Sequence, residues 1–366
     1  MKIIVSKDEI LAKLSNIQSI VEKRNTMPIL SHFLLDAGKS GSSITATDLD
    51  TALKEPLKIT VEKEGKICIP ARKMFEIVRE VEGDLTCETI DEQWLKVKVG
   101  ASNFRLACLA SKEFPAWPGM EDMEEFTMSG QVLSELIEKT VYAAGESDTR
   151  YTLNGLLFHV PAGDKITVVG TDGHRLALIQ RNIEGGVKEE RKLIIPRKAA
   201  VELRKLLDKG EEQVKVTLCK NHVLFSVGDI QFLTRLIEGT YPNYEQVIPS
   251  SNDKKILVGR AQFLKTARRV AIMSRERSNA VKVDISGGLI ALSSSNPDLG
   301  EARDEIAVDY KGDELSLGFN AKYLIDILEA MSSENISMEL QAPLSPVLLK
   351  EEKDADYLCV IMPMRI

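Results

Sequence analysis

The segment 171–177, with the sequence TDGHRLA, holds the side chains of this chain that are best suited to chemistry. A carboxylate that orients an imidazole makes a general base, so Asp172 and His174 could form an acid–base pair. No nucleophile and no group that would stabilise an electrophile stands near them in the sequence. Three interpretations therefore stay open: an enzyme that uses Asp172 and His174, a structural turn, or the wall of a binding pocket.

Other catalytic and metal-binding motifs are missing from the sequence. Gly38-Lys39-Ser40 matches the end of a phosphate-binding loop, but Phe33 stands where the first glycine of that motif would be. The four histidines lack metal-ligand spacing, and the five cysteines include no C-x-x-C pair. We therefore expect no metal, no cofactor and no membrane helix, and buried free thiols typical of a reducing cytoplasm.

The chain repeats itself about every 124 residues. A strand-like run that leads to Asp or Asn recurs at Asp48, Asp172 and Asn296, at spacings of 124 residues. A strand followed by a helical pattern recurs around Pro70 and Pro196, which are 126 residues apart. Two further anchors recur with nearly the same period, and such agreement indicates tandem copies of one structural unit. The three expected domains are 1–125, 126–252 and 253–366.

Each copy has the pattern of an antiparallel α+β unit. Most segments alternate apolar and polar residues, as half-buried strands do, and two segments per copy switch to the helical period. The predicted fold class is therefore α+β, with three tandem copies of one antiparallel sheet that carries two helices on one side. The six expected helices span 7–24, 71–82, 129–146, 197–209, 260–277 and 320–332.

Charge is distributed unevenly between these helices and the remainder of the chain. The whole chain has 48 basic and 55 acidic residues, a net charge of −7, which is not typical of a simple nucleic-acid-binding protein. The expected helices alone contain 20 basic and 14 acidic residues, so they carry +6 and the remainder carries −13. The helices could form an ordinary solvated face, or a surface that meets phosphates without reading sequence.

Several segments, taken in order along the whole chain, resemble the bacterial DNA sliding clamps, the beta subunits of DNA polymerase III. These segments are TDGHRLA, YTLNG at 151–155, IPRKA at 195–199, TYPNY at 240–244 and the C-terminal MPMR. The resemblance implies a head-to-tail homodimer that closes into a six-domain ring around duplex DNA, with basic helices inside. Such a ring attracts the phosphate backbone diffusely and makes no contacts with bases, so it can slide along the duplex. It would confer processivity on polymerases and would have no catalytic site of its own.

The resemblance also implies partners and a pocket for them. The partners are the DNA polymerase III alpha subunit, an ATP-driven clamp loader, and other polymerases and repair proteins, all at the nucleoid in the cytoplasm. Each inserts a short peptide, with Leu or Phe anchors, between the second and third domains. Thr152 and Gln246 differ from the aromatic and basic residues that some family members have there. The implied pocket consists of Leu153, Thr171, Gly173, His174, Arg175, Leu176, Pro242, Val247, Val360, Met362, Pro363 and Met364.

Two further surfaces follow from the resemblance. At the ring interface, Phe104 and Leu106 lie on one face of the strand 103–109, and they would meet Ile272 and Met273 of the other chain. The alternative for these four residues is an ordinary core position. The residues expected to face DNA are Arg24, Arg72, Lys73, Arg197, Lys198 and Arg275.

Overall fold

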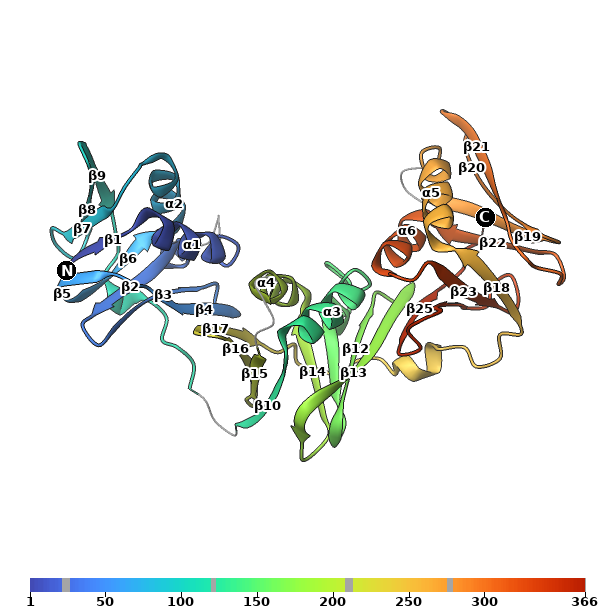
Figure 1. Ribbon diagram of the computed structural model, residues 1–366, viewed down its shortest axis with the longest axis horizontal. Helices are drawn as coiled ribbons and strands as arrows, with labels where there is room; N and C mark the ends of the chain where they lie inside the picture. The colour runs from blue at the N-terminus through green and yellow to red at the C-terminus, as the bar shows by residue number, and fades with distance from the viewer. Residues whose placement is uncertain (22–26, 120–122, 208–212, 275–278, 366) are drawn as a thin grey trace. The chain divides into compact units, whose positions relative to one another are not determined.

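The computed structural model describes residues 1–21, 27–119, 123–207, 213–274 and 279–365, which form two compact units (Figure 1). Unit 1 comprises Met1–Gln131 and Glu202–Leu236, and unit 2 comprises Val132–Val201 and Ile237–Ile366. The second expected copy is thus shared between the units. The reason lies in the ladder between β17 (Ile230–Arg235) and β4 (Thr51–Pro56), which bonds the end of the second copy to the first.

Unit 1 contains two antiparallel sheets. The smaller one has the order β5 (Thr60–Lys63), β1 (Lys2–Val5), β7 (Leu85–Thr89), β8 (Trp94–Val99) and β9 (Ser102–Ala107). In the larger one, β17 and β4 lie at the centre. On the β17 side follow β16 (His222–Val227), β15 (Gln213–Leu218) and β10 (Glu124–Ser129), and on the β4 side follow β3 (Gly41–Thr47), β2 (His32–Gly38) and β6 (Gly65–Pro70).

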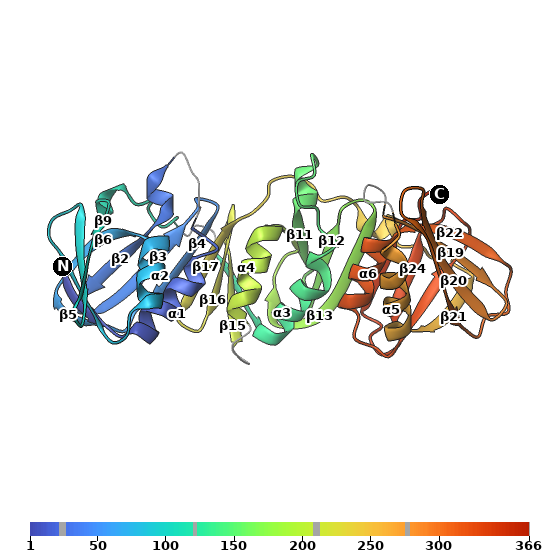
Figure 2. The ribbon, with the colours of Figure 1, turned by 90° about the horizontal axis from the view of Figure 1, so that it is seen from above.

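Two helices of unit 1, α1 (Lys7–Ile17) and α2 (Ala71–Glu80), lie side by side on one side of its strands (Figures 1 and 2). Helix α1 begins at Ser6, whose Oγ accepts the Glu9 N–H at 3.3 Å and so caps the first turn. Its apolar positions at helical spacing are buried against the sheet, as are those of α2. A third helix, α4 (Arg197–Leu207), begins in unit 2 and ends in unit 1.

Unit 2 also contains two antiparallel sheets. The larger one has the order β18 (Lys254–Gly259), β23 (Asn335–Leu340), β24 (Val347–Glu351), β25 (Tyr357–Ile361), β13 (Arg175–Val187), β12 (Gly163–Thr171), β11 (Gly155–Val160) and β14 (Arg191–Pro196). The smaller one has the order β21 (Gly300–Ala307), β20 (Leu289–Asn296), β19 (Ala280–Ser286) and β22 (Leu315–Asn320).

Helices α5 (Arg260–Ala271) and α6 (Ala321–Ala330) of unit 2 pack against each other, and α3 (Gly130–Val141) lies beside β12 and β13 (Figures 1 and 2). Phe263 and Val270 of α5 and Leu324 and Leu328 of α6 are buried at this contact side, which gives the helices their amphipathic pattern. Four short 3₁₀ helices complete the described elements: Pro28–Ser31, Ser111–Glu113, Tyr151–Asn154 and Tyr244–Val247.

The predicted α+β class and the six helices are confirmed, but α1, α2, α3, α5 and α6 are shorter than expected. Helix α1 stops at Ile17 and α5 stops at Ala271, where the backbone tightens: the Ile20 N–H bonds to the Ile17 carbonyl at 3.1 Å, and the Met273 N–H bonds to the Val270 carbonyl at 3.2 Å. Periodicity in the sequence cannot distinguish such a final turn from a continuing helix. The six observed helices contain 15 basic and 9 acidic residues, so their net charge is still +6.

All five cysteines are buried and unpaired, as expected. Burial raises the thiol pKa to about 12 for Cys68, Cys87 and Cys108 and to about 11 for Cys359, and it also raises the pKa of Cys219. None of the described helices is long and apolar enough to span a bilayer.

Candidate functional site

The segment that contains Asp172 and His174 is the turn between β12 and β13. Thr171 Oγ1 donates to the Arg175 carbonyl at 2.6 Å and accepts the Gly173 N–H at 3.0 Å. Asp172 Oδ1 accepts the N–H groups of His174 and Arg175 at 2.9 and 3.1 Å. The Thr and Asp side chains therefore satisfy the backbone of the turn, as they do in Asx and ST turns.

The same turn occurs 124 residues earlier, between β3 and β4. Thr47 Oγ1 donates to the Thr51 carbonyl at 2.9 Å and accepts the Leu49 N–H at 3.0 Å. Asp48 Oδ1 accepts the N–H groups of Asp50 and Thr51 at 3.1 and 2.6 Å. The recurrence assigns Asp172 to the architecture of the repeat rather than to a reaction.

His174 and Asp172 do not have the geometry of an acid–base pair. The carboxylate contacts the backbone N–H of His174, while the imidazole stacks on the Tyr323 ring at 6.3 Å between centroids. The second carboxylate oxygen of Asp172 accepts Arg175 Nε at 3.1 Å. A general base needs its carboxylate on the imidazole, so the arrangement favours a turn and a binding surface over catalysis.

Gly173 occupies the left-handed region of this turn, with φ +83°, and Leu49 has φ +80° in the matching turn. A Cβ on Gly173 would lie 2.7 Å from Nη1 of Arg150. We expect Gly173→Ala to lower the free energy of unfolding by about 1–2 kcal/mol, because alanine is strained at this φ, while the Arg150 guanidinium can shift to make room for the Cβ. Denaturant unfolding measures the change.

The matched control for Gly173→Ala is Leu49→Gly, which places glycine at the equivalent position of the first copy. Here release of left-handed strain offsets the extra chain entropy of glycine, so a change of less than about 1 kcal/mol is expected. Equal destabilisation by the two substitutions would contradict the assignment of strain to the left-handed position.

Arg175 lies beneath the turn and is only 8% exposed. Its guanidinium donates to Asp326 Oδ2 of α6 and to the Tyr142 carbonyl, both at 2.6 Å, besides its bond to Asp172. It also lies 4.4 Å from the centroid of the Tyr323 ring. Arg175 thus fixes the turn against α6 and supports the surface from below.

Apolar side chains surround this turn. Leu176 of β13 is opposite Val360 of β25, and both are almost fully buried. The chain then leaves β25 beside the turn, where the Met362 N–H donates to the His174 carbonyl at 2.9 Å. Thr171 is held beside these residues, because its N–H donates to the hydroxyl of Tyr241 at 3.1 Å and Tyr241 packs in the same cluster as Leu176 and Val360. We call this surface, where the resemblance places the partner peptide, the anchor pocket.

The remaining predicted pocket residues lie around this centre to different degrees. Pro242 and Val247 are exposed on the segment 237–248, whose Tyr241, Tyr244 and Ile248 pack on the same apolar cluster as Leu176 and Val360. Met364 continues along the C-terminal segment and donates its N–H to the Gly318 carbonyl of β22 at 2.8 Å. Pro363 is half-buried between Met362 and Met364. Leu153 is buried in the 3₁₀ turn Tyr151–Asn154, without a described contact to this centre.

Sequence reasoning missed several side chains at this surface. Arg150 donates to the Asp172 carbonyl at 2.9 Å and makes a two-point bond with Asp148, whose pKa it lowers to about 2. Tyr151 is 77% exposed beside it, and Tyr323 holds the His174 ring. Tyr151 was recognisable, because it begins the YTLNG motif, whereas Tyr323 comes from a helix far away in the sequence.

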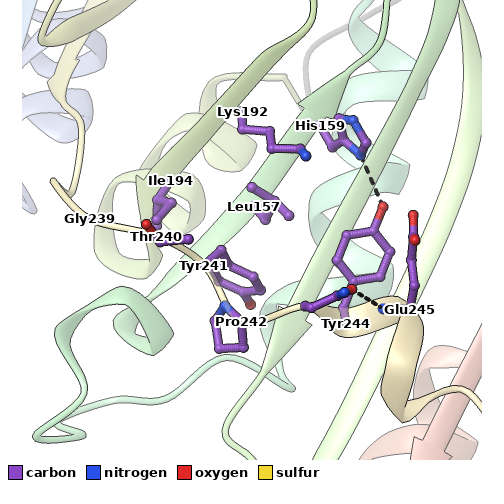
Figure 3. A pocket seen from close by; sticks show the side chains of 11 residues that line it. Leu157, His159, Lys192, Ile194, Gly239, Thr240, Tyr241, Pro242, Tyr244 and Glu245 are labelled. Carbon is purple, nitrogen blue, oxygen red and sulfur yellow. Dashed lines mark hydrogen bonds between the residues drawn. The ribbon is translucent and has the colours of Figure 1, made fainter.

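A groove of about 530 Å³ is lined by Tyr241 and Pro242 together with side chains of β11 and β14 (Figure 3). Two cross-strand pairs of β11 and β14 line it: Leu157 with Ile194 at its base, and His159 with Lys192 at its rim. His159 Nδ1 lies 3.0 Å from the Tyr244 hydroxyl, and its Nε2 lies 2.7 Å from Glu190. The hydrogen bond from Lys192, and then that from His159, keeps the pKa of Glu190 below its usual value. We call this second hollow the linker groove.

The predicted DNA-facing residues lie on helices where the structure describes them. Arg72 and Lys73 are exposed on α2 and pair with Glu76 at 3.0 and 2.7 Å. Lys198 is exposed on α4, and Arg197 beside it bonds to Glu146 at 2.9 Å. Arg24 and Arg275 lie outside the described residues.

The predicted ring-interface residues lie at two strand or helix ends. Phe104 is half-buried and Leu106 is 9% exposed on β9, where they face Val97 and Leu95 of β8. Ile272, directly after α5, is 72% exposed, and Met273 is half-buried. Such exposure of an isoleucine argues against an ordinary core position for Ile272.

The repeated antiparallel α+β unit, with six helices that together carry +6, is the architecture of a DNA sliding clamp. Three family descriptions match successive parts of the chain: the N-terminal, central and C-terminal domains of the DNA polymerase III beta subunit, at residues 1–118, 127–243 and 245–365. The chain belongs to this family, the bacterial sliding clamps, which are processivity factors of DNA replication.

Known relatives agree with this assignment over their full length. The beta sliding clamp of Pseudomonas putida is 35% identical and that of Escherichia coli 32%, each with 100% of both chains covered. Among solved structures, the sliding clamp of Bartonella birtlesii bound to griselimycin is 37% identical with a TM-score of 0.96, covering 100% of both chains. The clamp of Caulobacter crescentus is 34% identical with a TM-score of 0.94, again with 100% of both chains covered.

Proposed function

We propose that this protein is a homodimeric ring that encloses duplex DNA and tethers DNA polymerases, without catalysing a reaction itself. The observation that carries the proposal is the charge of its helices, +6 on a chain whose net charge is −7. Positive helices that face a duplex attract phosphates diffusely, and an acidic remainder keeps other surfaces off DNA. The proposed domains are 1–125, 126–252 and 253–366, close to the ranges that the family descriptions match.

Two open sheet edges support a head-to-tail ring. Among the described strands, β9 is bonded only to β8, and β21 only to β20. The first edge carries Arg105 on β9, and the second carries Glu301 on β21, so their charges are complementary. Phe104 and Leu106 beside one edge, and Ile272 and Met273 at the end of α5, would supply the apolar contact. An interface between two different surfaces closes into a ring when its rotation is two-fold.

Contact with DNA through the helices would be electrostatic and independent of sequence. We expect Lys198→Ala to weaken binding of short duplexes equally for all sequences and to reduce the slope of log K against log salt by about 1. Fluorescence anisotropy at several salt concentrations measures both quantities. Lys255→Ala, which removes an exposed lysine from strand β18, is the control and is expected to leave the slope unchanged. An equal change in both variants would contradict a role specific to the helices.

The anchor pocket is proposed to receive a short peptide from each partner. These partners are the DNA polymerase III alpha subunit, the clamp loader, and other polymerases and repair proteins. Buried Leu176 and Val360 supply an apolar base for Leu or Phe anchors, and the half-buried Met362 beside them gives a wall that adapts its shape. The protein would work in the cytoplasm, on the DNA of the nucleoid.

Retention on circular DNA tests this proposal directly. The protein is loaded onto nicked circular duplex with a cognate loader and ATP, and the circle is then cut. Retention on circles and rapid loss after cutting are expected, because a closed ring leaves DNA only over an end. Equal retention on circular and linear DNA, with loading verified by a control clamp, would contradict topological enclosure. Small-molecule turnover that disappears in His174→Ala would instead favour the enzyme alternative.

A further inference from the structure

We infer that the linker groove and the open edge of β14 bind an extended peptide segment of a partner protein, next to its anchor. This inference rests on the proposed function of the anchor pocket. The occupant to which we commit is the stretch of partner chain that directly adjoins the anchor residues. It would add to β14 as a further antiparallel or parallel strand and place an apolar side chain in the groove.

The first argument is continuity between the groove and the anchor pocket. One cluster of buried side chains runs across a single sheet face, from Ile194 through Leu157 and Val169 to Leu176 and Val360. The segment 237–248 lies across this face, with Tyr241 packed into the cluster. Tyr241 lines the linker groove and also accepts the N–H of Thr171 in the anchor pocket at 3.1 Å, and Pro242 belongs to both sets of residues. The two places therefore adjoin, and one short peptide can reach both.

The second argument is the hydrogen-bonding state of the strand that borders the groove. Strand β14 is bonded as a ladder only to β11. The Ile194 carbonyl accepts the Ile237 N–H at 2.9 Å, so the backbone groups of Ile194 point away from β11. Alternation along a strand then directs the N–H and C=O of Lys192 outward too, and neither has a bonding partner in the described part of the chain.

The third argument is the chemistry of the groove. Leu157 and Ile194 give it an apolar base, and Tyr241 and Pro242 give it an apolar wall (Figure 3). His159, Lys192 and Glu190 hold one another at its rim through bonds of 2.7 and 3.0 Å. Their charges largely cancel, so the groove selects for an uncharged side chain. An extended segment of small β-prone residues that places one apolar side chain, such as valine, in the groove fits both the edge and the groove.

The test compares synthetic peptides on the full-length protein by fluorescence anisotropy. The reference is a pentapeptide with Leu and Phe anchors. Two longer peptides add a five-residue Val/Thr extension, one at each end, and their controls carry a Gly/Ser extension of equal length. We expect one Val/Thr extension to lower Kd about tenfold relative to the pentapeptide, through edge hydrogen bonds and one buried side chain. The Gly/Ser extensions should change Kd less than about threefold.

Lys192→Pro and Lys192→Ala separate the backbone from the side chain. Proline removes the outward N–H without breaking the ladder to β11, whereas alanine keeps the N–H and removes only the ammonium group. The gain from the extension should disappear in Lys192→Pro and persist in Lys192→Ala, while the pentapeptide binds all three proteins equally. Hydrogen exchange should slow at Lys192 when the extended peptide binds to the wild-type protein.

A control that changes the peptide instead of the protein can still decide the question if Lys192→Pro does not fold. N-methylation of alternate residues in the extension removes its backbone donors, and we expect this to abolish the gain on the wild-type protein. A gain that survives N-methylation or Lys192→Pro, or no gain at either end, would overturn the inference. Failure of the pentapeptide itself to bind would instead contradict the anchor pocket, and the inference would fall with it.

Discussion

The Lys139→Met variant is expected to have a free energy of unfolding about 3–5 kcal/mol below that of the wild-type protein, because the substitution leaves the buried carboxylate of Glu351 without its positively charged partner. Lys139 Nζ of α3 lies 2.6 Å from Glu351 Oε1 of β24, and the two side chains are 9% and 3% exposed. Glu351 also accepts bonds from the N–H groups of Ser332 and Ser333 and from the Ser333 hydroxyl, at 3.0, 2.9 and 2.8 Å. Denaturant unfolding gives the free energy.

Two controls separate burial from charge in this variant. Lys215→Met breaks an exposed pair of similar length, Lys215 with Glu125 at 2.8 Å, and is expected to change stability by less than about 1 kcal/mol. Lys139→Met combined with Glu351→Leu removes both charges and should recover most of the loss. An equal loss of unfolding free energy in Lys139→Met and Lys215→Met would show that burial does not determine how much an ion pair contributes to stability.

The pH dependence of the loss follows from the same contacts. Burial by itself raises the pKa of Glu351, but the bonds from Lys139, Ser333 and Ser332 outweigh burial and hold that pKa below its usual 4.5. A carboxyl with a depressed folded-state pKa stabilises the protein above its unfolded pKa, and this contribution is lost as pH falls below it. In Lys139→Met the largest lowering bond is lost while burial still raises the pKa of Glu351, so this carboxyl protonates more readily in the variant. The difference in stability between wild type and Lys139→Met should therefore be largest near neutral pH and shrink as the pH falls toward and below about 4.5.

The Ile272→Asp variant is expected to remain folded but to dissociate into single chains and to lose retention on circular DNA by at least about 100-fold. Ile272 is 72% exposed, so the substitution removes little packing within the chain. In the proposed ring the same side chain is buried against the other chain near Phe104 and Leu106, and an unpaired carboxylate there is strongly unfavourable. Sedimentation and the circular-DNA assay measure the two effects.

The matched control for Ile272→Asp is Leu257→Asp on β18, since Leu257 is also apolar and 49% exposed. This variant should behave as the wild-type dimer, because the proposed interface does not include β18. Circular dichroism of both variants establishes that each is folded. A stable dimer of Ile272→Asp, or dissociation of both variants alike, would contradict the proposed interface.

The repeat made much of the fold predictable from the sequence. Three copies of one pattern located the six helices, and the recurrence of Asp48 at Asp172 placed the same strand end in two copies, while a turn, a pocket wall and an enzyme stayed open for Asp172. Helix ends were less predictable, since residues after Ile17 keep an apolar pattern and Ile20 is buried in the tightened turn that follows α1. An apolar pattern in the sequence indicates which residues are buried, and residues beyond the last helical hydrogen bond are buried as well. The pattern therefore does not locate the end of the helix.

The candidate site was predictable only where it depended on local motifs. The turn at Thr171 and the tail at Met362 lie in short distinctive segments. The pair of Lys139 with Glu351 joins residues 212 positions apart, so no local pattern could connect them. The linker groove was missed for a related reason. Leu157 and His159 read as an ordinary alternating strand, and only pairing with β14 shows that they border a hollow.

The burial of all five thiols has a practical consequence for labelling this protein. A thiol with a pKa of about 12 is ionised in about one molecule in 10⁵ at neutral pH, and the thiolate is the species that reacts with maleimides. The native cysteines are therefore expected to react only slowly with maleimides and other cysteine-directed reagents. One cysteine introduced at an exposed position would take a fluorophore or a crosslinker selectively, with every native cysteine left in place.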